Sequence, residues 1–71
     1  MKVIVFGGSG FLGSYVCDTL TQCGYDVTIA DTRASKYKTD AQKYVECDIM
    51  DKQGVDNVTA EADLVYNFAL N

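Results

Sequence analysis

A glycine-rich segment near the start of the chain constrains the fold more than any other feature. The apolar run Lys2 to Phe6 leads directly into the segment Gly7 to Gly13, which reads Gly-Gly-Ser-Gly-Phe-Leu-Gly. The run is continuous rather than alternating, which is typical of a strand buried on both faces of a parallel sheet. Glycine permits tight turns because it adopts backbone angles that a β-carbon forbids. We therefore expect the chain to open with a strand and a tight turn.

A helix is predicted directly after the turn, from Phe11 to about Gln22. Apolar residues recur every four positions, and this spacing gives a helix one apolar face. They are Leu12, Val16 and Leu20, with Gly13 and Cys17 beside them. Gly24 follows at the expected end of the helix and is placed to cap it, because glycine enters the left-handed conformation without strain.

The rest of the chain continues the alternation of strands with connecting segments. The polar stretch from 32 to 42 is expected to be irregular, with at most one helical turn. Asp51 is placed to cap a weak helix that runs to about Val58. Further strands are expected at Val27 to Ala30, Tyr44 to Cys47 and Leu64 to Phe68.

This order of elements predicts an α/β fold, a Rossmann-type parallel sheet. Strands joined by helical crossovers are parallel, and the crossovers are right-handed. Laying out the Rossmann order places the four strands as 3-2-1-4. A ligand crevice is expected at the carboxyl ends of the strands, where the strand order reverses between the first strand and the fourth.

The glycines match the pattern G-x-G-x-x-G that precedes a helix in dinucleotide-binding proteins. Gly7 and Gly8 permit the tight turn out of the strand. Gly10 leaves room for a diphosphate beside the main chain, and Gly13 lets the helix pack closely on the sheet.

A diphosphate bound here would meet the amides at the start of the helix, around Phe11 and Leu12. The helix dipole favours a negative charge at this end. A P-loop is excluded, because Gly13 is followed by Ser14 rather than by the lysine that neutralises phosphates in that motif. An FAD-binding Rossmann unit would use similar glycines and stays an alternative at this point.

Asp31 supports a dinucleotide, because it directly follows the second strand and lies 18 positions beyond Gly13. A carboxylate there can accept hydrogen bonds from both hydroxyls of an adenosine ribose, and it would repel a 2′-phosphate. NAD is therefore favoured over NADP. Arg33 opposes this preference, because an arginine nearby can neutralise a 2′-phosphate, and an NADP-linked reductase stays an alternative.

Two further residue pairs follow the third and fourth strands. Asp48 could accept a hydrogen bond from the adenine amino group, and Ile49 could pack on the adenine ring. An equally good interpretation is a polar residue that ends a strand, followed by a core isoleucine. Phe68 and Ala69 could line the path of the ribose and diphosphate, although such a pair is more often core.

Composition limits the partners of the chain. Its 71 residues carry a formal net charge of −4, and the only local basic cluster is Lys36-Tyr37-Lys38. This cluster is too short to follow a nucleic-acid backbone, and it is expected in a solvated loop. Neither nucleic acid nor an anionic membrane is an expected partner.

The cysteines indicate a compartment rather than a site. Cys17, Cys23 and Cys47 form no metal-ligand pattern, and the chain has no histidine. An odd number of cysteines without a secretory segment fits a reducing cytoplasm, with the thiols as small core residues. The apolar run Lys2 to Phe6 is too short for a signal peptide or a membrane span, so a soluble cytoplasmic protein is expected.

The segment Val5 to Ser14 resembles the opening of the extended short-chain dehydrogenases/reductases, and within them the nucleotide-sugar epimerases and dehydratases related to UDP-glucose 4-epimerase. Asp31, the pair Asp48-Ile49 and the segment Asp63 to Ala69 follow in the order typical of that family. The aromatic-aliphatic pair Phe11-Leu12 favours this family over FAD proteins. Asn67 and Leu70 depart from it, because the family often has histidine and a small residue at these places.

The resemblance implies NAD as the cofactor and an adenosine ribose held by residues 31 to 33. It also raises the weight of the adenine site at 48 and 49 and adds Leu70 to the residues that would line the ribose and diphosphate path. The resulting set of expected cofactor-binding residues is Gly7, Gly10, Phe11, Leu12, Gly13, Asp31, Thr32, Arg33, Asp48, Ile49, Phe68 and Ala69.

The resemblance also implies what residues 1–71 do not supply. The family's catalytic acid/base is the tyrosine of Tyr-x-x-x-Lys, and none of the five tyrosines here has a lysine four places on. We therefore expect no catalytic residue, a nucleotide-sugar substrate only in a longer parent, and a chain that is the N-terminal part of an NAD(P)-binding domain. A non-catalytic dinucleotide-sensing or interaction module is the alternative.

A chain of this size buries a small core, and its fourth strand would leave an open edge. Weak stability or self-association into a homo-oligomer is therefore expected for residues 1–71.

Overall fold

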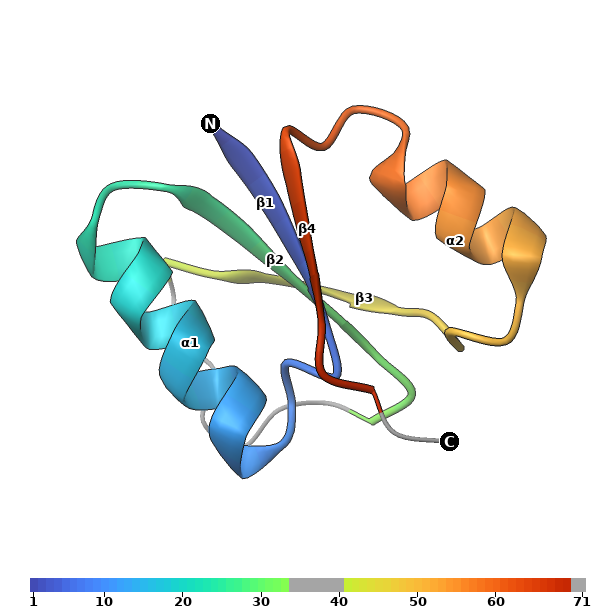
Figure 1. Cartoon of the computed structure of the whole chain (residues 1–71), viewed down its shortest axis with the longest axis horizontal. Helices are drawn as coiled ribbons and strands as arrows, with labels where there is room; N and C mark the ends of the chain where they lie inside the picture. Colours follow the sequence, from blue (N-terminus) through green and yellow to red (C-terminus); the bar gives the residue numbers. More distant parts are fainter. Residues whose placement is uncertain (34–40, 70–71) are drawn as a thin grey trace.

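A four-stranded parallel sheet lies at the centre of the structure, a computed structural model that describes residues 1–33 and 41–69 (Figure 1). Its strands run in the order β3-β2-β1-β4. This confirms the predicted α/β fold, the Rossmann-type sheet and the strand order 3-2-1-4. The described elements are β1 (Lys2–Phe6), α1 (Phe11–Gln22), β2 (Asp26–Asp31), β3 (Lys43–Glu46), α2 (Lys52–Thr59) and β4 (Leu64–Asn67).

The strand β1 is buried on both faces, as its continuous apolar run predicts. Val3 and Val5 face α1 and belong to one hydrophobic cluster, whereas Ile4 and Phe6 belong to a second cluster on the face of α2. The alternation follows from the two-residue period of a strand. The two helices lie on opposite faces of the sheet (Figure 1).

The core-facing stripe of α1 differs from the predicted one. Gly13, Ser14 and Cys17 are the buried residues of the helix, and Leu20 packs against the same cluster. Leu12, which the four-residue spacing placed on the apolar face, is 61% exposed. The prediction was wrong for Leu12, whereas Gly13, Cys17 and Leu20 lie on the core side as expected.

The two helix ends illustrate what local patterns can predict. Gly24 has φ +92° and follows α1, as expected for a glycine cap. Its amide donates to the carbonyl of Thr21 over 3.0 Å, and the amide of Tyr25 donates to that of Leu20 over 3.2 Å. These two bonds form a Schellman motif. Asp51 does occupy the position before α2, but its side chain makes no capping hydrogen bond.

The bounds of β1 are the predicted ones, whereas those of the other three strands differ by one residue. β2 is longer than expected at both ends, β3 lies one residue earlier, and β4 ends at Asn67 rather than Phe68. Single backbone hydrogen bonds continue past two of these ends. The amide of Cys47 donates to the Asp31 carbonyl over 3.0 Å, and that of Phe68 to the Phe6 carbonyl over 2.7 Å.

Two of the three cysteines lie in the core, and the third does not. Cys17 and Cys47 are buried, whereas Cys23 is exposed because it directly follows the last turn of α1. The prediction of core thiols was therefore wrong for Cys23. The cluster Lys36-Tyr37-Lys38, most of the polar stretch from 32 to 42, and Leu70 lie outside the described residues. Within the described residues, neither helix has the length and apolar character needed to cross a bilayer.

Candidate dinucleotide-binding site

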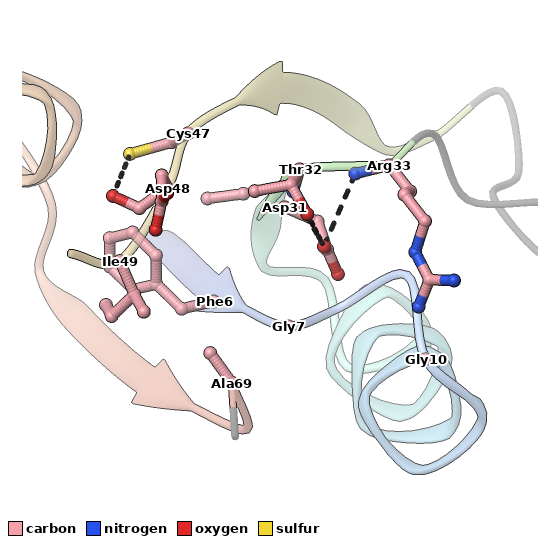
Figure 2. A pocket seen from close by; sticks show the side chains of 11 residues that line it. Phe6, Gly7, Gly10, Asp31, Thr32, Arg33, Cys47, Asp48, Ile49 and Ala69 are labelled. Atoms are coloured by element: carbon pink, nitrogen blue, oxygen red, sulfur yellow. Dashed lines mark hydrogen bonds between the residues drawn. The ribbon is translucent and has the colours of Figure 1, made fainter. Parts of the chain in front are cut away.

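A cavity of about 370 Å³ opens at the carboxyl ends of the strands (Figure 2). All four strand ends, or the residues that follow them, contribute to its wall, so the crevice extends from β4 across β1 and β2 to β3. Eight of the expected cofactor-binding residues line it: Gly7, Gly10, Asp31, Thr32, Arg33, Asp48, Ile49 and Ala69. Three lining residues that the sequence interpretation missed are Phe6, Ala30 and Cys47.

The turn after β1 requires glycine at Gly7 for two reasons. Its φ is +76°, in the left-handed region that favours glycine. A β-carbon at this position would also lie 2.6 Å from the amide nitrogen of Ala69. Gly7 therefore allows the chain after β4 to pass directly over the turn.

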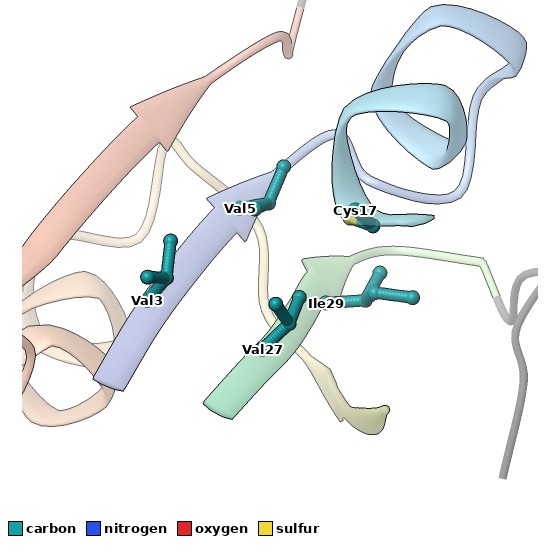
Figure 3. Packing of buried hydrophobic residues seen from close by; sticks show 5 residues of the cluster. All are labelled: Val3, Val5, Cys17, Val27 and Ile29. Atoms are coloured by element: carbon teal, nitrogen blue, oxygen red, sulfur yellow. The ribbon is translucent and has the colours of Figure 1, made fainter. Parts of the chain in front are cut away.

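Gly8 is needed for packing rather than for its backbone angles. It has no positive φ, so the expectation that the turn needs special angles at both glycines is wrong for Gly8. A β-carbon there would lie 3.0 Å from the Ile29 side chain and 3.1 Å from the Cys17 sulfur. These two side chains pack together between the sheet and α1 (Figure 3).

Gly13 brings the helix close to the turn. A β-carbon on Gly13 would overlap the carbonyl oxygen of Gly7 and lie 2.9 Å from the α-carbon of Gly8. The close contact predicted against the sheet is thus made against the turn before it. Without Gly13, α1 could not start where it does.

Gly10 is the one glycine of the motif that folding does not explain. Its φ of −76° and ψ of 171° are extended angles that any residue adopts. A β-carbon would have one neighbour within 4 Å, the Gly7 carbonyl oxygen at 3.6 Å, which is an ordinary contact. Because Gly10 is exposed and lines the cavity, the missing side chain leaves its main chain open to a ligand.

The start of α1 can attract an anion. The first intrahelical bond runs from the Ser14 amide to the Gly10 carbonyl over 2.8 Å, so the amides of Leu12 and Gly13 precede the helical ladder. The first turn carries no acidic side chain that would compete for this end. Phe11 and Leu12 themselves have exposed side chains and are not among the residues that line the cavity.

Asp31 lies against the glycine turn, although 17 residues separate it from Gly13. Its Oδ2 accepts a hydrogen bond from the Ser9 amide over 3.1 Å, and its Oδ1 accepts one from the Thr32 amide over 2.7 Å. The carboxylate is half-buried and lines the cavity. An anion-attracting helix start and a carboxylate that can accept further hydrogen bonds therefore lie side by side.

Arg33 reaches back from the end of β2 toward the same turn (Figure 2). Its main-chain carbonyl accepts a hydrogen bond from the Ser9 hydroxyl over 2.6 Å. Arg33, the Asp31 carboxylate and the main chain of Gly10 thus line the same cavity. This combination can hold a group that carries both phosphates and hydroxyls.

The far end of the cavity is more apolar. Ile49 packs against the cluster that contains Phe6, as the core interpretation predicts, and it also lines the cavity, where its contact with adenine stays a prediction. Asp48 is exposed, and its Oδ1 accepts a hydrogen bond from the Met50 amide over 2.9 Å. Burial raises the pKa of the Cys47 thiol, and the carboxylates of Asp51 and Asp48 raise it further. Cys47 is therefore an apolar wall rather than a nucleophile.

The pair after β4 separates into two roles. The side chain of Phe68 packs against the cluster of Val3 and Val5 on the α1 face and does not line the cavity. Ala69 does line it, and its amide donates to Asn67 Oδ1 over 2.9 Å. Position alone could have indicated Phe6, Ala30 and Cys47, because each lies at or just after the carboxyl end of a strand.

Residues 3–71 match the model of the NAD dependent epimerase/dehydratase family, and the chain belongs to this family. The UDP-glucose 4-epimerase of Bacillus subtilis (strain 168) is 30% identical, with 97% of this chain and 24% of that protein covered.

Solved structures agree. The UDP-glucose 4-epimerase of Thermotoga maritima with UDP-glucose superposes with a TM-score of 0.87 at 28% identity, covering all of this chain and 25% of the other. The Thermus thermophilus UDP-glucose 4-epimerase complex with NAD gives 0.84 at 29% identity, covering all of this chain and 24% of the other. The chain thus spans about a quarter of the length of these relatives.

Proposed function

We propose that residues 1–71 are the N-terminal part of an NAD-binding domain and that the parent protein is an NAD-dependent nucleotide-sugar epimerase or dehydratase. The observation that supports this most directly is the hydrogen bond between the Asp31 carboxylate and the Ser9 amide of the glycine turn. It brings together the two groups that recognise adjacent parts of a dinucleotide. Family membership and the NAD complex of the Thermus thermophilus relative support NAD as the ligand class.

The residues present fit such a ligand. The diphosphate would lie over Gly10 and the first turn of α1, where main-chain amides and the helix dipole favour negative charge. The adenosine ribose would donate hydrogen bonds to Asp31. Adenine would lie between Asp48 and Ile49 in the apolar end of the cavity, with Ala69 on the opposite side.

NAD would supply a hydride acceptor, and the chain's own residues would bind and orient it. No tyrosine of residues 1–71 is followed by lysine at the fourth position. Acid/base catalysis and binding of the nucleotide sugar are therefore assigned to further residues of the parent protein. Within this chain, the proposed contribution is cofactor affinity and selectivity.

Selectivity for NAD over NADP depends on which charge dominates beside the ribose. The Asp31 carboxylate already accepts three main-chain hydrogen bonds, which hold it at the end of β2. A 2′-phosphate would meet this fixed negative charge directly, whereas the attraction of Arg33, which lines the same cavity, would only partly offset the repulsion. We therefore propose that NAD binds more tightly than NADP.

Calorimetric titrations of the 71-residue chain with NAD and with NADP test the proposal. Replacing Asp31 by alanine removes acceptors for ribose hydroxyls, and hydrogen bonds to a charged group contribute about 1.5–3 kcal/mol. NAD affinity should therefore fall at least tenfold, whereas NADP affinity should stay equal or rise. Asp26→Asn is the matched control, because Asp26 lies at the opposite end of β2 and pairs only loosely with Lys43, over 3.8 Å. Equal binding of both nucleotides, unchanged by Asp31→Ala, would refute the proposal.

A further inference from the structure

Ser9 connects the glycine turn to the end of β2 through both its main chain and its side chain. Its amide donates to Asp31 Oδ2 over 3.1 Å, and its hydroxyl donates to the main-chain carbonyl of Arg33 over 2.6 Å. Ser9 is one of the unspecified positions of the glycine motif, so the sequence pattern assigns it no role. The side chain is half-buried between the two segments that it joins.

We propose that Ser9 is a positioning residue whose hydroxyl fixes the segment from Asp31 to Arg33 against the glycine turn and so sets the spacing between the diphosphate and ribose sites. This inference rests on the proposed function and deepens it. The hydroxyl holds Arg33, the Ser9 amide holds one carboxylate oxygen of Asp31, and the Thr32 amide holds the other. The carboxylate is thereby fixed at both oxygens before a ligand arrives.

Fixing this spacing in advance favours binding. The adenosine ribose of a dinucleotide is joined to the diphosphate through its C5′–O5′ bond, so the two groups lie a short distance apart and both half-sites must be in place at once. Ordering a loop only upon binding costs free energy that is subtracted from the affinity. A single hydrogen bond that maintains the ordered arrangement contributes enough to change affinity about twofold to tenfold.

The fold itself does not depend on the Ser9 hydroxyl, because β3 anchors the end of β2 from the other side. The Asp31 carbonyl accepts hydrogen bonds from the Cys47 amide over 3.0 Å and from the Tyr44 hydroxyl over 3.0 Å. The main chain of Asp31 therefore stays in the sheet when Ser9 changes. What the hydroxyl controls is the segment beyond it, Thr32 and Arg33, whose amides in turn orient the carboxylate.

The test compares Ser9→Ala, Ser9→Thr and the wild-type chain. Ser9→Ala should weaken NAD binding twofold to tenfold in calorimetry, leave the thermal midpoint without ligand within about 2 °C, and speed hydrogen exchange of the residue-9 amide. Ser9→Thr should restore NAD affinity, because it restores the hydroxyl. Inorganic pyrophosphate, which has no ribose, should bind equally to the wild-type chain and to Ser9→Ala.

A double-mutant cycle with Asp31→Ala separates positioning from a direct contact. If Ser9 acts through Asp31, Ser9→Ala should have little further effect on NAD affinity in the Asp31→Ala chain. Additive losses, or an unchanged NAD affinity in Ser9→Ala, would overturn the inference while the proposed function stands. A wild-type chain that binds no NAD would overturn both the proposed function and the inference that rests on it.

Discussion

Replacing Gly10 by serine should weaken dinucleotide binding at least tenfold without harming the fold. Gly10 precedes α1 with ordinary extended angles, and a β-carbon there meets its nearest neighbour at 3.6 Å. Serine is a better helix cap than glycine, so the free energy of unfolding should rise by about 0.2–0.5 kcal/mol. The added side chain would stand where a diphosphate must approach the main chain. Losing one hydrogen bond to a charged phosphate costs about 1.5–3 kcal/mol, which lowers NAD affinity about tenfold to a hundredfold.

Gly13→Ala is the matched comparison, because it places the same extra carbon three residues away. That carbon would overlap the Gly7 carbonyl and lie 2.9 Å from the α-carbon of Gly8. Overpacking of this kind costs about 1–3 kcal/mol, so Gly13→Ala should lower the urea midpoint. Urea unfolding and NAD calorimetry on both variants give the result. NAD affinity within twofold of wild type in Gly10→Ser, or a loss of stability like that of Gly13→Ala, would refute the reasoning.

Two further predictions concern stability and association. Burial, with a smaller contribution from Asp18, raises the pKa of the Cys17 thiol from 9.0 to about 11. Above pH 9 the unfolded chain releases a proton that the folded chain retains, so the free energy of unfolding is unaffected below pH 9 and falls between pH 9 and 11. The fall is at most about 2.7 kcal/mol. Urea unfolding from pH 8 to pH 11 should show this loss in the wild-type chain and a smaller one in Cys17→Ala; equal pH dependence in both would contradict it. The open edge of β4, where Val65 is 49% exposed, should cause concentration-dependent association in sedimentation velocity. Val65→Lys should reduce this association. Met50→Lys, which adds the same charge at an exposed site after β3, should leave it unchanged. A wild-type chain that stays monomeric at all concentrations would refute the prediction that the edge of β4 causes association.

The fold could be predicted because several independent patterns require the same arrangement. The continuous apolar run of β1 requires cover on both faces, and the two helices supply it. Short connections between strands of this kind restrict the topology to right-handed crossovers. The strand limits were less predictable, because single hydrogen bonds, such as that from Phe68 to Phe6, continue past the last paired residue.

The candidate site was predictable where a residue's place along a strand fixes its place in space. Asp31 and Asp48 follow neighbouring parallel strands, so both had to reach the same edge of the sheet. The hydrogen bond from the Ser9 hydroxyl to the Arg33 carbonyl was not predictable, because it depends on how close the glycine turn lies to the end of β2. The sequence also could not show that Phe68 packs in the core while Ala69 lines the cavity. Adjacent residues after a strand point to opposite faces only if the extended conformation continues.

The glycine motif combines two requirements that a sequence pattern cannot separate. Gly7, Gly8 and Gly13 are explained by the turn and its packing, since a β-carbon at any of them would meet an atom within 3.0 Å. A chain that had lost its ligand would still need these three glycines to fold. Gly10 alone has neither the angles nor the neighbours that demand glycine, so its lack of a side chain is better explained by an approaching ligand. Gly10 is therefore the glycine whose replacement tests dinucleotide binding. If Gly10→Ser left NAD affinity unchanged, the requirements of folding would be sufficient to explain the whole glycine motif.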